Sequence, residues 1–334
     1  MPLPVGKLPA ALLGRLLALC RDDPRVLVRP GIGHDAAALA FGDRVVVAKT
    51  DPITFATDRI GWYAVNINAN DVACLGATPR FFLATLLLPE GKASDEMVEG
   101  IFRDLAASCE ALGVTLCGGH TEVTYGLDRA IVVGQMLGEV ARARLVTNAR
   151  SEAGDDVLLT KGIAIEGTAL IAREMAFELR GAVDAAVLER ARGYLDAPGL
   201  SVVPDAAAVC RATLPHALHD PTEGGLATGL HELADAAGLG VAVEAEAIRV
   251  FPETEALCRH YGLDPLGLIA SGALLAVTAP ADTAAALAAL ASEGIAAARI
   301  GRMAERTEGV TIGRGGRREP LPRFDSDEVA RLFS

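Results

Sequence analysis

Aspartates that stand beside glycines or close an apolar run are the residues best suited to chemistry in this sequence of 334 residues. The stretch Pro30–Ala37 carries Gly31, Gly33 and Asp35, and a second aspartate, Asp51, follows the apolar run after it. Glycines let backbone N–H groups approach a phosphate, and aspartates can hold the Mg²⁺ that accompanies it. We therefore expect a phosphate and magnesium site around these residues.

A dinucleotide-binding loop is the first alternative. Gly31–Ala36 fits that fingerprint, and Asp51 lies about 20 residues further on, where a ribose-binding carboxylate belongs. A helix must follow such a loop, and a whole strand–helix–strand crossover takes at least about 10 residues. Only residues 36–41 precede Gly42-Asp43, which is typical of a hairpin turn. The sequence favours two strands, 36–41 and 44–49, over a nicotinamide cofactor. A tight turn with a solvated aspartate remains the simpler alternative.

A third aspartate, Asp71, lies in the apolar helix predicted for residues 61–75. A lone buried carboxylate is costly, so Asp71 must either be solvated or have a partner. A cation held together with Asp35 and Asp51 is one such partner, and carboxylates are the ligands that Mg²⁺ prefers.

Two further glycine motifs follow. A predicted strand over 114–117 runs into Gly118-Gly119-His120-Thr121-Glu122, and ligands often dock at such strand ends. His120 could position a phosphate or transfer a proton, and a structural histidine is an equally good reading. Further on, Asp220 or Thr222 can cap a helix that runs to residue 237, and Gly224 and Gly225 would let an anion approach its positive end. A plain capped helix start is the alternative.

The elements that must position these residues alternate between strands and helices. In the first half we expect helices over 8–20, 61–75 and 95–112 and strands over 36–41, 44–49, 81–88, 114–117 and 130–140. In the second half we expect strands near 157–159, 241–243 and 273–277 and helices near 167–178, 184–192, 204–213, 220–237, 252–261 and 282–292. This order predicts an α/β or α+β fold. We expect two domains, 1–150 and 151–334, and a loose tail over 314–322.

Composition and sequence patterns argue against several classes of protein and of site. The net charge of −12 argues against a nucleic-acid surface, and no apolar run reaches the ~18 residues that span a bilayer. The N-terminus lacks a secretory signal pattern, so the cytoplasm is expected. The six cysteines contain no C-x-x-C pair, which disfavours a zinc site or a disulfide framework. No nucleophile motif is present.

The order of the motifs resembles the aminoimidazole-ribonucleotide (AIR) synthetase superfamily over nearly the whole chain. The motifs are Gly-x-Asp-Ala-Ala, Thr-Asp, Asn-Asp, Gly-Gly-x-Thr and Asp-Pro-Thr-x-Gly-Gly-Leu-Ala. This superfamily includes thiamine-monophosphate kinase, selenophosphate synthetase and the hydrogenase maturation factor HypE. The HypE family is the one that the sequence resembles most, through His219–Ala227 and Gly262–Leu266.

The resemblance implies a homodimer in which N-terminal mixed-sheet domains form a shared barrel, each followed by a C-terminal α/β domain. ATP and Mg²⁺ would bind near that interface. By matching position, the metal ligands would be Asp35, Asp51 and Asp71, the nucleotide-binding residues Gly31, Gly33, Gly118, Gly119, Thr121, Thr222, Gly224 and Gly225, and the catalytic residues His120 and Asp220. Partners would be a small-molecule substrate or a maturation-complex protein, without nucleic acid or membrane.

The resemblance also has departures. His34 and His120 stand where several relatives carry acidic residues, and the chain as given ends in Ser334, where HypE proteins carry a cysteine that bears the carbamoyl group. We therefore expect a HypE-like, ATP-dependent ligase or transferase that activates a carbonyl or amide oxygen of an unknown substrate, in hydrogenase or metallocofactor maturation. The alternatives are a small-molecule kinase like thiamine-monophosphate kinase and a non-catalytic ATP-binding partner protein. Selenophosphate synthesis is disfavoured, because Cys20 is the only cysteine before the first glycine motif.

Overall fold

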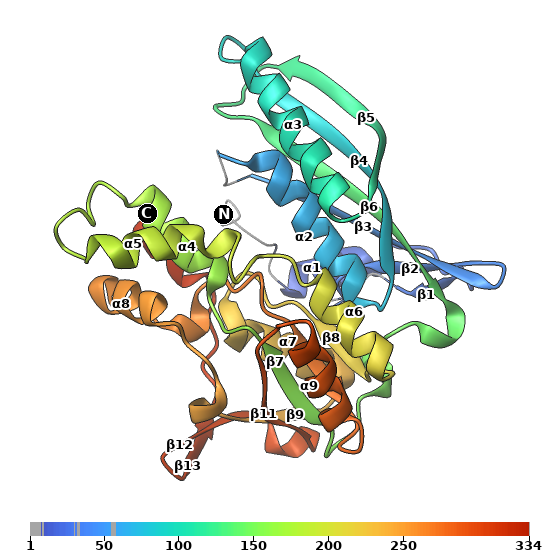
Figure 1. The fold of residues 1–334 in the computed structure, drawn as a ribbon. Helices are drawn as coiled ribbons and strands as arrows, with labels where there is room; N and C mark the ends of the chain where they lie inside the picture. The colour runs from blue at the N-terminus through green and yellow to red at the C-terminus, as the bar shows by residue number, and fades with distance from the viewer. Residues whose placement is uncertain (1–7, 9, 30, 32–33, 55–57, 334) are drawn as a thin grey trace. The chain divides into compact units, whose positions relative to one another are not determined.

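The computed structural model describes residue 8 and residues 10–29, 31, 34–54 and 58–333. They form two compact units (Figure 1). The N-terminal unit comprises Asp23–Arg29 and Asp35–Leu145, and the C-terminal unit comprises the other described residues, chiefly those from Val146 onward. Each unit contains one sheet with helices packed on it, which confirms the predicted mixed α/β class. The domain boundary after residue 150 stays a prediction.

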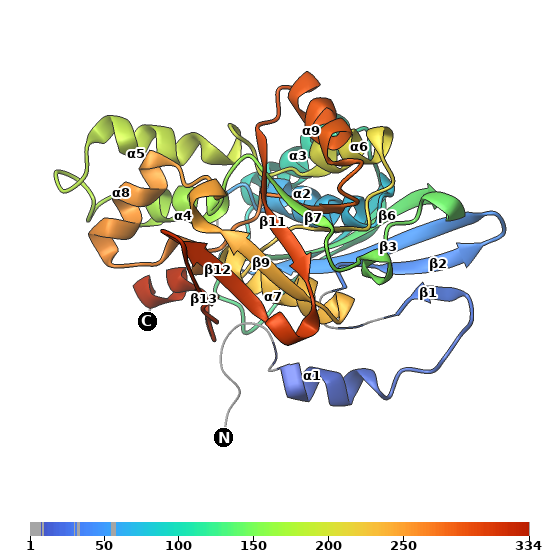
Figure 2. The same ribbon diagram turned by 90° about the horizontal axis from the view of Figure 1, so that it is seen from below.

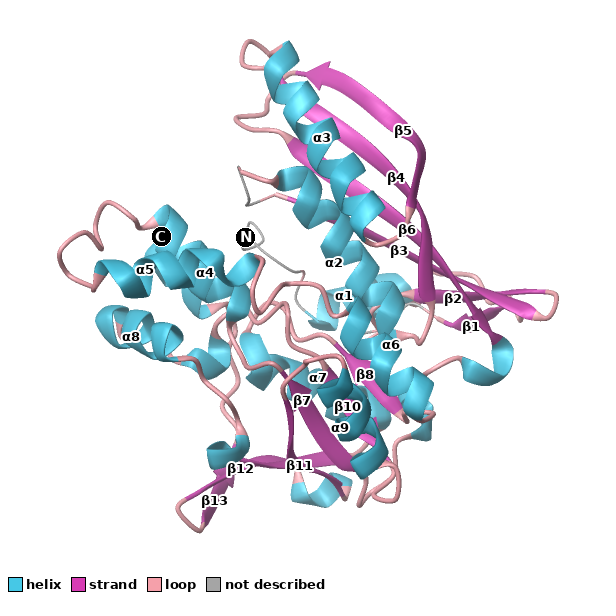
Figure 3. Ribbon diagram, viewed as in Figure 1, coloured by secondary structure: helices cyan, strands magenta, loops and turns pink. Residues whose placement is uncertain are grey.

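The sheet of the N-terminal unit has the strand order β1-β2-β3-β6-β4-β5. Its strands are β1 (Val26–Val28), β2 (Ala37–Phe41), β3 (Arg44–Ile53), β4 (Thr78–Pro89), β5 (Thr115–Thr124) and β6 (Ile131–Ala141). Neighbouring strands are antiparallel except β4 and β5, which are parallel. The helices α2 (Ile60–Cys74) and α3 (Asp95–Ala111) lie along one face of this sheet, as Figures 1 and 3 show.

The hairpin β2–β3 settles the choice between the two interpretations of the first glycine motif. Its turn is at Gly42, whose φ of 61° favours glycine. Strand β2 begins at Ala37, so a strand and not a helix follows the glycines. The hairpin prediction is therefore confirmed, and the described residues 34–41 do not form the helix that a dinucleotide loop requires.

Helix α2 is buried around almost its whole circumference, and it packs against strands β3, β4 and β6 and against α3 beside it. A Cβ atom at Gly61 would come within 2.6 Å of the Ile101 carbonyl oxygen, so the two helices approach closely at this glycine. Asn66, Asn68, Asn70 and Asp71 are all at most 5% exposed. Polar side chains at such positions need partners inside the protein.

The sheet of the C-terminal unit has the order β13-β12-β9-β11-β7-β10-β8. Its strands are β7 (Asp156–Thr160), β8 (Ala217–His219), β9 (Gly240–Glu244), β10 (Leu275–Thr278), β11 (Ala297–Ala304), β12 (Val310–Arg314) and β13 (Arg317–Pro320). In Figure 2, α7 (Gly225–Ala237) lies on one side of this sheet, and α6 (Val203–Ala212) and α9 (Thr283–Ser292) on the other. A separate helical group contains α4 (Ile165–Glu174), α5 (Ala185–Arg192) and α8 (Pro252–Tyr261).

Two expectations need correction. The glycine- and arginine-rich tail over 314–322 is not loose: Arg314 and Arg317 flank the turn of the β12–β13 hairpin, and β12 adds to the sheet parallel to β9. The first helix is shorter than expected, at Ala10–Leu17, and its predicted apolar stripe stays largely exposed, with Leu16 at 45% and Leu19 at 81%. Among the described helices, none is long and apolar enough to cross a lipid bilayer.

Candidate functional site

The three predicted aspartates of the N-terminal unit gather around one lysine, Lys49. Lys49 and Asp51 are two residues apart on β3, so both side chains lie on the same face of the strand. Asp71 comes from the last turn of α2. The Lys49 Nζ atom lies 3.0 Å from Asp71 Oδ2 and 3.5 Å from Asp51 Oδ2, and Asp35 is near enough to act on its charge. The structure therefore brings Asp35, Asp51 and Asp71 into one cluster.

The neighbouring carboxylates keep Lys49 protonated. Burial is the largest effect on its pKa and lowers it, but the charges of Asp71, Asp51 and Asp35 together outweigh burial and raise the pKa above the ordinary lysine value. Lys49 is therefore an ammonium ion at neutral pH. Sequence reasoning missed this residue, although its position two residues before Asp51 in a strand already places it on the same face.

Backbone contacts hold the cluster in place. Asn68, one turn before Asp71 on α2, donates hydrogen bonds to the carbonyls of Ala64 at 2.8 Å and Asp51 at 3.4 Å. Thr50 donates its hydroxyl to the Gly134 carbonyl at 2.9 Å. The donor set of three carboxylates consists only of hard oxygen atoms, which fits Mg²⁺. That Asp35, Asp51 and Asp71 hold the ion stays a prediction.

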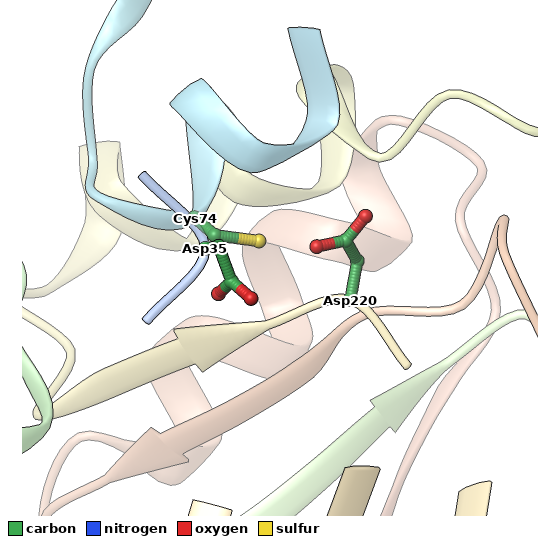
Figure 4. A group of neighbouring side chains, drawn as sticks. All are labelled: Asp35, Cys74 and Asp220. Carbon is green, nitrogen blue, oxygen red and sulfur yellow. The ribbon is translucent and has the colours of Figure 1, made fainter. Parts of the chain in front are cut away.

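Cys74 is a second feature that the sequence analysis missed. It follows Asp71 by one helical turn and is 2% exposed, and its sulfur lies within 4.8 Å of a carboxylate oxygen of Asp35. Figure 4 shows the side chains of Asp35 and Cys74 next to each other. A thiol is a soft donor, so the aspartates and not Cys74 are the natural ligands of Mg²⁺.

The motif from Gly118 to Glu122 lies within strand β5 and not in a loop after it, which corrects the expected end of the strand at residue 117. The cause is the long parallel pairing with β4, which continues from Phe81 opposite Thr115 to Pro89 opposite Thr124. Because β5 is the edge strand and exposed on both faces, its sequence lacks the apolar alternation that signals a strand.

One row of residues crosses the sheet from Asp51 to the glycines. Asp51 pairs with Gly134 on β6, Gly134 with Ala84 on β4, and Ala84 with Gly119 on β5. Three strand spacings of about 4.8 Å place Gly119 about 14 Å from Asp51 along this row. Gly119 therefore lies in the same row as Asp51 but does not touch the aspartate cluster within the unit, and Thr121 lies two residues further along β5.

Packing explains one of these glycines. A Cβ atom on Gly119 would lie 1.9 Å from the Ala84 carbonyl oxygen, whereas nothing lies within 4 Å of one on Gly118. Gly119 is therefore required for the approach of β5 to β4. His120 is 66% exposed in its side chain, and its Nε2 lies 3.0 Å from Glu122 Oε2. Its role as an acid–base group stays a prediction.

The second glycine motif lies in the C-terminal unit, between β8 and α7. Asp220 directly follows β8 and is 1% exposed. The prediction that Asp220 or Thr222 caps the helix is wrong: the N-cap is Gly224, which has φ 75° and no side-chain cap. The Gly224 N–H instead donates to Asp327 Oδ2 at 2.7 Å, so a carboxylate from later in the chain satisfies the helix start. Thr222 accepts backbone hydrogen bonds from Gly225 and Ala270.

Glu166 is a buried carboxyl group in the first turn of α4 that the sequence analysis did not select. Part of the residue reaches the surface, but its Oε2 is buried and has no hydrogen-bond partner among the described residues. Burial raises the pKa of Glu166 to about 7; a hydrogen bond from Ser271 opposes this rise, and the charges of Asp327 and Glu223 add to it. Glu166 therefore titrates near neutral pH.

Replacing Glu166 with glutamine is expected to stabilise the protein at pH 8 and to change little at pH 4. The folded-state pKa is raised above the unfolded value, so the stability contributed by the protonated carboxyl is present below about pH 4.5 and is lost as the pH rises through about 7. Glutamine avoids that loss, and each pKa unit corresponds to about 1.4 kcal/mol, so we expect a gain of about 2–3 kcal/mol at pH 8. Urea unfolding at both pH values measures it; an equal effect at the two values would contradict the assignment.

Two predicted nucleotide-binding residues precede β2. Gly31 is described, and a Cβ atom on it would lie 3.0 Å from His34 Nδ1, so the turn holds this imidazole close to its backbone. Gly33 lies outside the described residues.

Comparisons with known proteins define the class of this chain. Residues 33–140 match the family model of the AIR synthase related protein N-terminal domain, and residues 152–313 match that of its C-terminal domain. The two-sheet fold and the aspartate cluster thus belong to an AIR synthase related protein.

Similar proteins identify the family within the AIR synthase related class. Carbamoyl dehydratase HypE of Cupriavidus necator is 32% identical over 310 residues, which cover 90% of this chain and 84% of the relative. This chain belongs to the HypE family. Similar solved structures include HypE in complex with ATP (TM-score 0.72, 25% identity, 95% and 91% of the two chains) and a HypE–HypF complex (0.75, 24%, 94% and 100%). AaThiL complexed with AMPPCP and TMP has the same fold (0.72, 19%, 94% and 94%).

Proposed function

We propose that this chain binds ATP with Mg²⁺ at the aspartate cluster and uses it to activate the oxygen of a carbamoyl or amide group in hydrogenase maturation. The observation that carries the proposal is the convergence of Asp35, Asp51 and Asp71 around Lys49. The names of relatives as carbamoyl dehydratases and the solved complex of a HypE protein with ATP support it.

In this proposal the residues of the chain bind and orient the nucleotide and neutralise its charge. The three carboxylates would hold the ion and, through it, the phosphate groups of the nucleotide, and positioning of this kind supplies most of the catalysis in phosphoryl transfer. Bound Mg·ATP supplies an electrophilic phosphorus that turns a poor leaving group, the amide oxygen, into a good one. Asn68 and Thr50 keep Asp51 in place through the backbone. The glycines and Thr121 of β5 and the residues Asp220, Thr222, Gly224 and Gly225 remain proposed contacts of the nucleotide or substrate.

A homodimer built through the N-terminal unit is part of the proposal. Strand β5 is an edge strand that is exposed along nearly its whole length, and edge strands of this length are usually covered. Phe81, Val123 and Tyr125 are 49%, 59% and 84% exposed on β4 and at the end of β5. The complex of a HypE protein with HypF supports a maturation protein as a further partner.

Replacing Asp71 with asparagine is expected to weaken ATP binding in the presence of Mg²⁺ at least about tenfold. The substitution keeps the size of the side chain but removes one of three charges from the ion site, and each factor of ten corresponds to about 1.4 kcal/mol. Titration calorimetry measures the affinity. Asp128→Asn is the matched control, because Asp128 is fully exposed in the same unit.

Unchanged affinity in Asp71→Asn would overturn the metal assignment, and no binding of millimolar ATP to the unmodified protein would overturn the proposed function. Release of phosphate or pyrophosphate from ATP, measured with carbamoyl and amide compounds, then tests the activation step. Release that requires a phosphorylated thiamine instead would replace it with a kinase activity.

A further inference from the structure

We propose that Lys49 is a built-in cation of the aspartate cluster: it takes the place of one metal ion, so that the cluster binds a single divalent ion, and it moves to the phosphate groups when Mg·ATP binds. The first part rests on the contacts within the N-terminal unit. The second part also rests on the proposed function, because it needs a bound nucleotide.

The charges of the cluster support a single ion. Three carboxylates and one ammonium leave two net negative charges, which one divalent ion neutralises. A second divalent ion would leave an excess of positive charge in a place where Lys49 is 20% and Asp71 only 7% exposed in their side chains. Uncompensated charge is costly where so little water reaches it.

The position of Lys49 supports competition with the ion. Its Nζ atom contacts Asp71 Oδ2 at 3.0 Å and Asp51 Oδ2 at 3.5 Å, so it faces two of the oxygens that would bind the metal. An ion that binds both carboxylates must displace the ammonium from at least one of them. Without Lys49, the same carboxylates repel one another and attract a divalent ion more strongly.

The chemistry of lysine supports the move to phosphate. Its ammonium is a compact charge on a flexible four-carbon stem with three donors, so it can exchange one anionic partner for another without a change in the backbone. Lys49 is anchored on β3, and Asp51 follows it on the same face of the strand. A phosphate group on the ion would therefore lie within the range of the side chain and replace the carboxylate that the ion has taken.

The test compares Lys49→Met with Lys92→Met. Methionine keeps the length of the side chain and removes the charge, and Lys92 is an exposed lysine of the same unit that pairs with Asp128. Mn²⁺ binding without nucleotide is followed by electron paramagnetic resonance of the free ion, and ATP binding with Mg²⁺ by calorimetry. We expect one Mn²⁺ site in the unmodified protein. In Lys49→Met we expect about tenfold tighter Mn²⁺ binding or a second site, together with about tenfold weaker ATP binding. Lys92→Met should change neither.

Effects of opposite sign are the signature of the proposal. Weaker or unchanged Mn²⁺ binding in a folded Lys49→Met protein would overturn it. Lys49→Arg keeps the charge and provides a second test: it should bind Mn²⁺ as the unmodified protein does, and tighter binding would also overturn the proposal. If neither protein binds ATP but Mn²⁺ binds more tightly to Lys49→Met, the built-in cation stands while the move to phosphate and the proposed function fail.

Discussion

Replacing Lys161 with methionine is expected to lower the free energy of unfolding by about 3–5 kcal/mol, because it leaves a buried carboxylate without its counter-ion. Lys161 follows β7 in the C-terminal unit, and its Nζ atom lies 3.2 Å from Asp205 Oδ2, with side-chain exposures of 8% and 1%. The same ammonium donates to the carbonyls of Ser201 at 2.6 Å and Gly272 at 3.0 Å. Burial lowers the pKa of Lys161, and the charge of Asp205 opposes this.

Urea unfolding of Lys161→Met, Asp205→Asn and the double variant measures this effect. The double variant should recover part of the loss, because it removes the buried charge together with its partner. Some loss should persist, since the carbonyls of Ser201 and Gly272 still lack their donor. Lys92→Met, at an exposed ion pair, should cost less than about 1 kcal/mol. A cost this small for Lys161→Met would show that the buried pair contributes little.

Replacing Gly119 with alanine should destabilise the N-terminal unit by about 3–5 kcal/mol. The new Cβ atom would lie 1.9 Å from the carbonyl oxygen of Ala84 and 2.9 Å from its nitrogen, so β5 must separate from β4 at this point. Overpacking of this kind costs on the order of 1–3 kcal/mol, and the φ of 149° adds backbone strain of similar size for a residue with a side chain.

Gly118→Ala isolates the contribution of strain. Gly118 has a similar φ of 155°, but nothing lies within 4 Å of a Cβ atom built on it. We expect it to cost about 1–3 kcal/mol from strain alone. Thermal unfolding followed by circular dichroism compares the two variants. Equal losses would mean that the contact with Ala84 does not limit the approach of the strands.

The sequence predicted those parts of the site that have a local signal. The three aspartates stand next to recognisable turns or inside an apolar helix, and the hairpin turn at Gly42 explains why Asp35, just before β2, comes near Asp51 on β3. Lys49 was missed because a lysine in a strand is usually read as solvent-facing. Its burial depends on α2, which packs across β3 and brings Asp71 to it.

Other features depend on contacts far apart in the chain. Strand β8 has only three residues, too few to show the alternation of apolar and polar residues that predicts a strand. In β11 the alanines and arginines do not alternate either. The glycines of β5 suggested a loop, although the strand continues through them because β4 pairs with all of it. The start of α7 is satisfied by Asp327, more than one hundred residues away, and no local pattern predicts such a partner.

The strand order of the N-terminal unit determines when this unit can fold during synthesis. Strand β6 lies between β3 and β4, yet it is the last of these strands to leave the ribosome. Until Ile131–Ala141 has been synthesised, the β2–β3 hairpin and the β4–α3–β5 segment have no strand to join them. Folding of this unit during synthesis must therefore wait for its central strand. The row from Asp51 to Gly119 forms only when that strand is in place, so the aspartates and the glycines are aligned in the final step of assembly.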